Sequence, residues 1–222
     1  RSSKGDRGLN RFERFLNRNN HKGIKNLMLY IVIGNAIVFL LSMTDRGYTI
    51  VNYFTFVPSL IMQGQIWRLI TFVFIPMPSN LFTLLLTLYF YYMVGSVLER
   101  EWGILKFNVY YFTGIALTII YSLISNTYAS AHYINLSLFF AFATLFPDFQ
   151  ILLFFIIPIK IKYLAYIDAA FFLFGILLNR FPANLLPLIA IANYFIYFYQ
   201  DFIYFFRRQR VTARNTVSFK NK

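Results

Sequence analysis

The sequence predicts an all-α membrane protein that crosses the bilayer six times. Hydrophobic residues make up 59% of the 222 residues and charged residues only 13%, whereas a soluble domain has about 25% charged residues. Six segments are long and apolar enough for a membrane-spanning or deeply buried helix: residues 27–43, 81–98, 107–125, 134–146, 163–178 and 185–206. The fourth segment is shorter than a full span, so we expect it to be a buried central helix.

The basic residues predict where the two ends of the chain lie. Of the 21 Lys and Arg residues, eight fall within residues 1–25 and six within residues 207–222. Six crossings with both tails in the cytoplasm place 18 of the 21 on the cytoplasmic side, which is the asymmetry that the positive-inside rule requires. Topology and anionic lipid then explain the net charge of +13, so we expect no nucleic-acid partner.

The chain is expected to form one membrane domain with two basic extensions. Residues 1–26 are a polar, basic cytoplasmic leader whose few apolar residues have helical spacing. An amphipathic helix on the membrane surface and a solvated leader both fit that pattern. Residues 27–206 form the membrane domain, and residues 207–222 form a basic cytoplasmic tail.

Two motifs flank the second segment. The loop before it contains the run Gly-Gln-Ile-Trp-Arg-Leu-Ile-Thr at residues 64–71, and the segment ends with Gly95 and Glu99. These motifs resemble those of the rhomboid superfamily of intramembrane proteases and of their relatives, the derlins, and the resemblance covers about residues 24–206. It implies a six-helix rhomboid-like bundle. The first loop, residues 44–80, is apolar and broken by prolines, so we expect it to be embedded in the membrane.

The motif residues have a structural interpretation of their own. An indole belongs at the membrane interface, and an arginine beside it can bind the carbonyls of a proline-broken loop or a lipid headgroup. We expect a loop clamp rather than a ligand site, because a buried charge needs a partner. The residues of this structural motif are Gly64, Gln65, Trp67, Arg68, Gly95 and Glu99.

The positions that would carry rhomboid chemistry are all changed. The resemblance implies a serine at the start of the fourth segment, a histidine base in the sixth and a His-x-x-x-Asn pair in the second. The matching positions hold His132, Asn193, Thr83 and Thr87. Serine is a poor nucleophile without an adjacent base, and the oxyanion needs preorganised donors. Ser130 and Ser137 are off register by two and five residues, and the sixth segment has no histidine. We therefore expect no catalytic residue.

Three polar residues within the apolar segments form a second candidate site: Asp168, Asn135 and Asn193. They could mark an ion or proton path. We favour hydrogen bonds between helices, because no second ionisable group accompanies Asp168. A displaced Ser–His–Asp set would need His132 and Asp168 on the same side. Asp168 lies only six residues after cytoplasmic Lys162, about 9 Å from the opposite face.

The sequence thus favours a non-catalytic, derlin-like pseudoprotease that binds transmembrane segments of client proteins. The alternatives are an intramembrane serine protease with a displaced Ser–His dyad, and a small transporter or lipid-binding scaffold. No cysteine and no metal, phosphate or dinucleotide motif is present, so we expect no metal and no cofactor. The expected partners are the bilayer and membrane-protein clients. The expected location is a bacterial plasma membrane, with several crossings and both termini in the cytoplasm.

Overall fold

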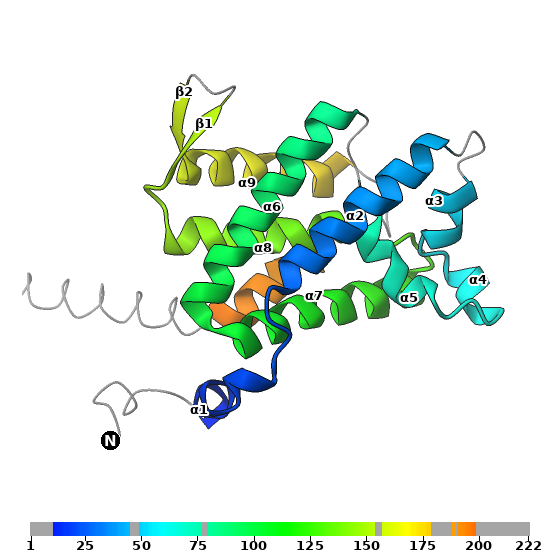
Figure 1. Cartoon of the computed structure of the whole chain (residues 1–222), viewed down its shortest axis with the longest axis horizontal. Helices are drawn as coiled ribbons and strands as arrows, with labels where there is room; N and C mark the ends of the chain where they lie inside the picture. The colour runs from blue at the N-terminus through cyan, green and yellow to red at the C-terminus, as the bar shows by residue number, and fades with distance from the viewer. Residues whose placement is uncertain are drawn as a thin grey trace, which may run out of the picture.

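The computed structural model describes residues 11–44, 49–76, 80–153, 157–178, 188–189 and 191–198. These residues are mostly helical, with one short β-hairpin (Figure 1). In chain order the elements are α1 (Arg11–Arg18), η2 (Asn20–Lys22), α2 (Leu27–Thr44), α3 (Thr49–Phe54), α4 (Pro58–Met62), α5 (Arg68–Thr71), η3 (Phe72–Phe74), α6 (Leu81–Trp102), α7 (Ile104–Ser125), α8 (Ala131–Leu145), β1 (Gln150–Leu153), β2 (Ile157–Lys160) and α9 (Ile161–Leu178). Residues 191–198 are also helical, and we call them the C-terminal helical segment.

Three helices of the described part of the chain are long and apolar enough to cross a membrane. They are Asn20–Thr44, Leu81–Trp102 and Ile104–Ser125, with mean hydropathies of 2.2, 1.8 and 1.5, and Ala131–Leu145 is a shorter apolar helix. Five of the six predicted segments coincide with α2, α6, α7, α8 and α9. The sixth, residues 185–206, is described only at residues 188–189 and 191–198. The structure is therefore a mostly helical membrane protein with three candidate spans and further apolar helices.

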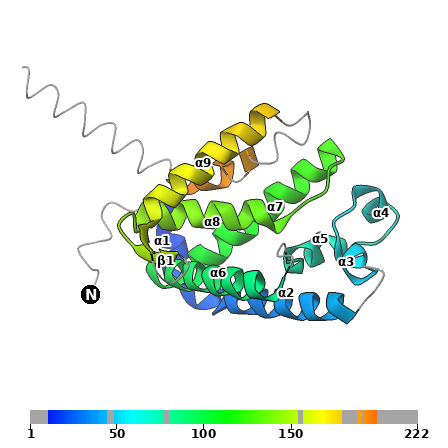
Figure 2. The same ribbon diagram turned by 90° about the horizontal axis from the view of Figure 1, so that it is seen from above.

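The long helices pack side by side around α8. Helix α2 packs on α6, α6 packs on α7 and α8, and α8 packs on α7 and α9. Seen from above, α8 lies between α9 on one side and α6 on the other (Figure 2). The largest fully buried side chains include Tyr110, Tyr111 and Phe107 of α7 and Phe142 of α8. Nine of the 15 residues of α8 are buried, so this short helix is the centre of the described bundle.

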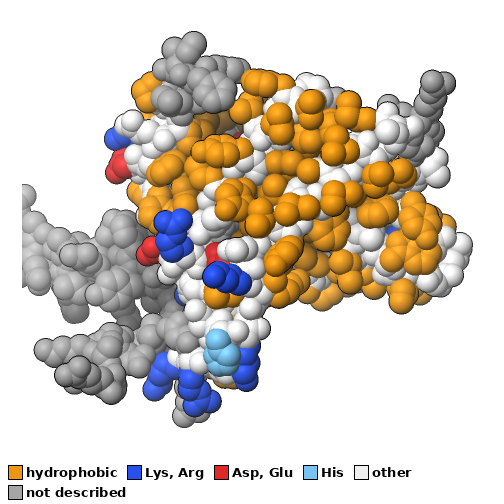
Figure 3. All heavy atoms as spheres, viewed as in Figure 1, with side chains coloured by type: hydrophobic (Ala, Val, Ile, Leu, Met, Phe, Trp, Pro, Cys, Tyr) orange, Lys and Arg blue, Asp and Glu red, His pale blue; other side chains and the backbone are white. Residues whose placement is uncertain are grey.

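The two ends of the bundle differ. Helices α3, α4 and α5 gather at one end, and α1 and the β-hairpin lie at the other (Figures 1 and 2). Hydrophobic side chains cover the face formed by α2 and α6, whereas Lys and Arg side chains gather at the α1 end (Figure 3). An apolar band with basic residues at one end is the surface expected of a protein that sits in a bilayer.

The described residues of the N-terminal segment pack on the bundle. Leu16 of α1 is only 2% exposed, and both α1 and η2 pack on α7. The Leu105 N–H donates to Asn20 Oδ1 at 3.0 Å. The Ile24 N–H donates to Asn108 Oδ1 at 2.7 Å, and Asn108 Nδ2 donates back to the Ile24 carbonyl at 3.0 Å. These contacts attach described residues of the predicted leader to α7.

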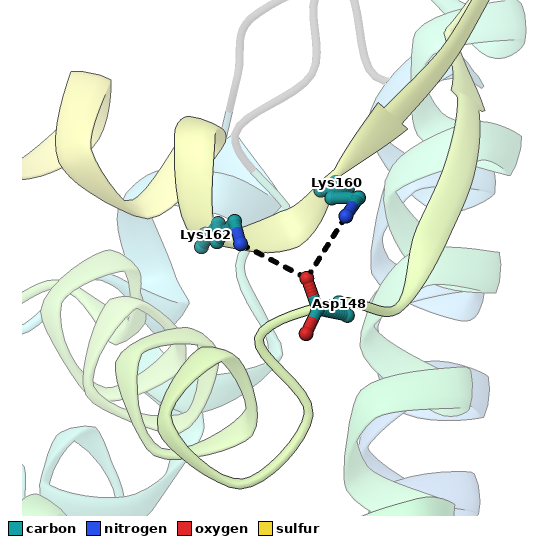
Figure 4. A network of polar contacts seen from close by, with 3 residues as sticks. All are labelled: Asp148, Lys160 and Lys162. Carbon is teal, nitrogen blue, oxygen red and sulfur yellow. Dashed lines mark hydrogen bonds and ion pairs between the residues drawn. The ribbon is translucent and has the colours of Figure 1, made fainter.

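The apolar stretch after α8 folds into an antiparallel hairpin. Gln150 pairs with Lys160, and Leu153 pairs with Ile157. Lys160 Nζ and Lys162 Nζ both donate to Asp148 Oδ1, at 3.1 and 2.9 Å (Figure 4). One carboxylate thus joins the start of the hairpin to the start of α9.

Candidate functional site

The Trp-Arg motif binds the end of α3. The guanidinium of Arg68 donates to the carbonyls of Asn52 and Thr55, each at 2.6 Å. The indole N–H of Trp67 donates to the Tyr53 carbonyl at 3.3 Å, and the Thr71 hydroxyl donates to the Phe54 carbonyl at 2.9 Å. The acceptors are four successive carbonyls, those of residues 52–55. These are the groups that a helix leaves without intrahelical partners at its C-terminus.

The environment of Arg68 explains why this position holds an arginine. Its side chain is only 4% exposed. Its Nε donates to Gln65 Oε1 at 2.7 Å, and its guanidinium carbon lies 5.8 Å from the centroid of the Tyr53 ring. Tyr53 also stacks on Trp67, with ring centroids 5.0 Å apart. A planar guanidinium spreads five N–H donors over three nitrogens, so it can serve three separated acceptors at once.

The other motif residues bring helices together. A Cβ added at Gly95 would lie 2.6 Å from the Cβ of Met28, so glycine permits the close approach of α6 and α2. The Glu99 carboxylate accepts the Asn26 N–H at 2.8 Å, just before α2 begins. Gly64 has a φ of +101° and turns the chain ahead of the Trp-Arg pair. All these contacts are within the chain.

Asn193 lies against Ser137, not against His132. Asn193 is 1% exposed and Ser137 is fully buried. Asn193 Nδ2 donates to Ser137 Oγ at 3.2 Å and to the Tyr110 carbonyl at 3.3 Å. The Tyr110 hydroxyl is hydrogen-bonded to Ser137 Oγ and also donates to the Ser137 carbonyl at 3.0 Å. These three residues come from α7, α8 and the C-terminal helical segment, and they form what we call the Ser137 cluster.

Of these two residues of α8, Ser137 and not His132 therefore contacts Asn193. Helix α8 begins at Ala131, where Ser130 Oγ accepts the His132 N–H at 3.2 Å as an N-cap. His132 and Asn135 instead line a small hollow with Thr87 on the side of α2 and α6. The other predicted oxyanion position, Thr83, donates its N–H and hydroxyl to Asn80 Oδ1, both at 2.8 Å, at the start of α6.

Asp168 lies apart from the Ser137 cluster. It is half-buried on α9 and close enough to His132 for an electrostatic interaction. Within the described ranges, however, no hydrogen bond or salt bridge forms on the Asp168 carboxylate or on the His132 ring. Asn135, Asn193 and Asp168 do not converge on one site.

The chemistry open to the Ser137 cluster follows from these contacts. A serine nucleophile needs a base within hydrogen-bond reach. The groups that reach Ser137 Oγ in the described part of the chain are an amide N–H and a phenol, and neither takes up a proton near neutral pH. Asn193 Oδ1 is buried without a partner among the described residues. The hydrogen bonds of the cluster thus link three helices of the described part of the chain.

A groove opens between α8, α9 and the C-terminal helical segment. Its volume is about 470 Å³. Its lining is mostly apolar, and the Thr144 hydroxyl is hydrogen-bonded to the Tyr194 hydroxyl at 2.7 Å inside it. We call it the α8–α9 groove; its lining residues are Phe140, Ala143, Thr144, Pro147, Lys162, Ala165, Tyr166, Ala169, Leu173, Ile191, Tyr194 and Phe195.

Comparison with known proteins places the chain in a family. Residues 25–219 match the family described as eukaryotic integral membrane protein (DUF1751). The chain belongs to this family. Multi-pass membrane embedding is thus shown. The description as eukaryotic does not support the bacterial plasma membrane that the sequence led us to expect.

The similarity to rhomboids is distant and partial. The Rhomboid-like protease 1 of Toxoplasma gondii is 31% identical over 100 residues, which are 41% of this chain and 33% of that protein. The chain of this DUF1751 protein thus matches about a third of its relative's length. No solved structure matches.

The sequence pointed to some of these residues and missed others. The Trp-Arg motif residues were predicted, and they lie together. The sequence places Ser137 five residues out of register with the family position, and it gives no indication of Tyr110. Tyr110 lies on an apolar helix among many aromatics, and nothing in its local sequence distinguishes it.

Proposed function

We propose that this protein is a non-catalytic, rhomboid-like pseudoprotease that binds transmembrane segments of client proteins. The observation that carries the proposal is the contact between Ser137 and Asn193. If the distant rhomboid similarity extends to the site, a serine is kept in the fourth apolar segment but its partner is an amide instead of a base. In this proposal the chain crosses the membrane six times, with both termini in the cytoplasm.

Asp168 supports the client-binding half of the proposal. Helix α9 packs mainly on α8 and exposes large apolar side chains, among them Phe171 at 71%. Asp168 lies one turn before Phe171 and has no hydrogen-bond partner among the described residues. A carboxyl in an apolar helix face is costly unless another group engages it. A client segment with a lysine or an amide at the same depth would supply that group.

The client-binding test uses photo-crosslinking in vesicles. A photoreactive amino acid replaces Phe171, and the same replacement at Tyr89, 68% exposed on α6, is the matched control. The probes are two single-span peptides, one all-leucine and one with a central lysine. We expect crosslinking of the lysine peptide at position 171, reduced by Asp168→Ala. Equal crosslinking at both positions, or of both peptides, would overturn client binding at α9.

The competing function is proteolysis by a displaced Ser130–His132 dyad. Ser130 Oγ already caps α8 by accepting the His132 N–H, which weighs against that role. A fluorophosphonate probe tests it directly, and we expect no labelling. Labelling that disappears in Ser130→Ala or Ser137→Ala would show an active serine and refute the pseudoprotease proposal. For the topology, a reporter fused after residue 222 should be active only on the cytoplasmic side.

A further inference from the structure

The α8–α9 groove has a basic mouth. Lys162 lines the groove, and its Nζ lies 2.9 Å from the same Asp148 oxygen that Lys160 contacts (Figure 4). Two ammonium groups thus share one carboxylate, which leaves this cluster with a net charge of +1. Each ammonium has three N–H donors, and the hydrogen bond to Asp148 uses one of them. The cluster can therefore donate to a further anion.

Aromatic residues indicate where the mouth of the groove lies relative to the membrane. Tyr163 and Tyr166, at the start of α9, are 53% and 68% exposed, and Lys162 Nζ lies 5.7 Å from the centroid of the Tyr163 ring. Exposed tyrosines beside lysines at a helix end are typical of the membrane interface, where headgroups lie. The groove thus begins at headgroup level.

From that mouth the groove runs into the apolar part of the protein. Ala165, Ala169 and Leu173 line it at successive turns of α9, and eight residues of helix rise about 12 Å. Small side chains on α9 and Ala143 on α8 leave the space that larger residues would fill. A volume of about 470 Å³ lies within the range of ligand sites. An apolar hollow of this length fits part of an acyl chain.

We propose that the α8–α9 groove binds one anionic phospholipid. One acyl chain lies along Ala165 and Ala169, and the phosphate lies at the ammonium groups of Lys160 and Lys162. The choice of an anionic lipid rests on charge complementarity, since the groove is apolar and its mouth has excess positive charge. This site is distinct from the Ser137 cluster and from the proposed client contact at Asp168. It does not depend on the proposed function.

The test measures lipid retention by native mass spectrometry. The full chain, purified in a neutral detergent, is titrated with phosphatidylglycerol or with phosphatidylcholine of the same acyl chains. We expect one phosphatidylglycerol to be retained preferentially. Each lysine near an anionic headgroup contributes about a five-fold preference, which corresponds to about 1 kcal/mol. The Lys160→Gln/Lys162→Gln variant should lose the preference and still bind lipid.

Three further variants make the outcome decisive. Ala169→Phe fills the groove and should abolish retention of both lipids, with folding checked by circular dichroism and gel filtration. Asp148→Asn raises the charge of the cluster and should increase the preference for phosphatidylglycerol. Arg100→Gln, which removes an exposed basic residue of α6, should change nothing.

The opposite results overturn the proposal. Equal retention of the two lipids by the unmodified chain would show that the basic mouth does not select a headgroup. An unchanged preference in the double lysine variant, or in folded Ala169→Phe, would place the lipid elsewhere. Displacement of the lipid by inorganic phosphate would show that the headgroup contacts alone account for binding, without the groove.

Discussion

Replacing Arg68 by alanine tests whether the Trp-Arg motif is a structural clamp. The substitution removes hydrogen bonds of 2.6 Å to the carbonyls of Asn52 and Thr55, and one of 2.7 Å to Gln65. An unsatisfied buried acceptor costs about 1–3 kcal/mol. Leaving both carbonyls unsatisfied would therefore cost at most about 2–6 kcal/mol. Water can reach the partly buried end of α3, so we expect a loss of about 2–4 kcal/mol in the free energy of unfolding.

The assay is unfolding by sodium dodecyl sulfate in mixed micelles, followed by tryptophan fluorescence. The chain has two tryptophans, Trp67 and Trp102, so a Trp102→Phe background leaves Trp67, stacked on Tyr53, as the reporter. Arg68→Lys keeps the charge but cannot reach all three acceptors, so it should recover about half of the loss. Exposed Arg100→Ala is the matched control and should lie within about 0.5 kcal/mol of the parent.

Two results would refute the clamp. If Arg68→Ala unfolds within about 0.5 kcal/mol of the parent, the α3 carbonyls do not depend on the guanidinium. If stability is unchanged but crosslinking of the client peptide is lost, the motif is a recognition surface. Stability and binding are therefore measured on the same preparations.

The remaining predictions concern three other sites. Asn193→His should give no fluorophosphonate labelling, because Ser137 is fully buried and its hydroxyl is hydrogen-bonded to Tyr110; labelling that Ser137→Ala abolishes would contradict this. Gly95→Val should destabilise the chain by about 1–3 kcal/mol in the same micelle assay, because its Cβ would collide with α2; an unchanged midpoint would mean that the helices can separate without cost. Hydrogen bonds from Lys162 and Lys160 hold the pKa of the Asp148 carboxyl below its ordinary value. The stabilisation that Asp148 gives the hairpin should therefore be complete at pH values above the ordinary pKa, and it should be lost as the pH falls through the lowered pKa. Titration of the Asp148 carboxyl by NMR checks the direction, and an ordinary pKa would show that the lysine contacts do not persist in solution.

The sequence predicted the helices well and the contacts between them poorly, for a physical reason. Apolar residues surround α7 and α8 on all sides, as helices in lipid permit, so periodicity does not show which face meets the bundle. Only the sparse polar residues indicate which face of the helix points into the bundle. His132 and Ser137 are five residues apart, which is more than one helical turn, so a choice between them changes the predicted inward face. The Trp-Arg clamp was easier to recognise because Trp67 and Arg68 bind carbonyls only 13 to 16 residues before them in the chain. The docking of residues 14–26 on α7 depends on residues far along the chain, which no local pattern reveals.

The attachment of the amino-terminal segment has a consequence for biosynthesis. Asn26 is held by Glu99, 73 residues later, and Ile24 is held by Asn108, 84 residues later. At a synthesis rate of about 5–20 residues per second, those partners emerge roughly 4–17 s after the segment itself. During that interval the start of α2 lacks its later partners, and the surrounding water, headgroups or insertion machinery must satisfy its N–H groups. The first span can therefore reach its final place only after the α6–α7 turn has been made, which makes this attachment a late step in the assembly of the protein.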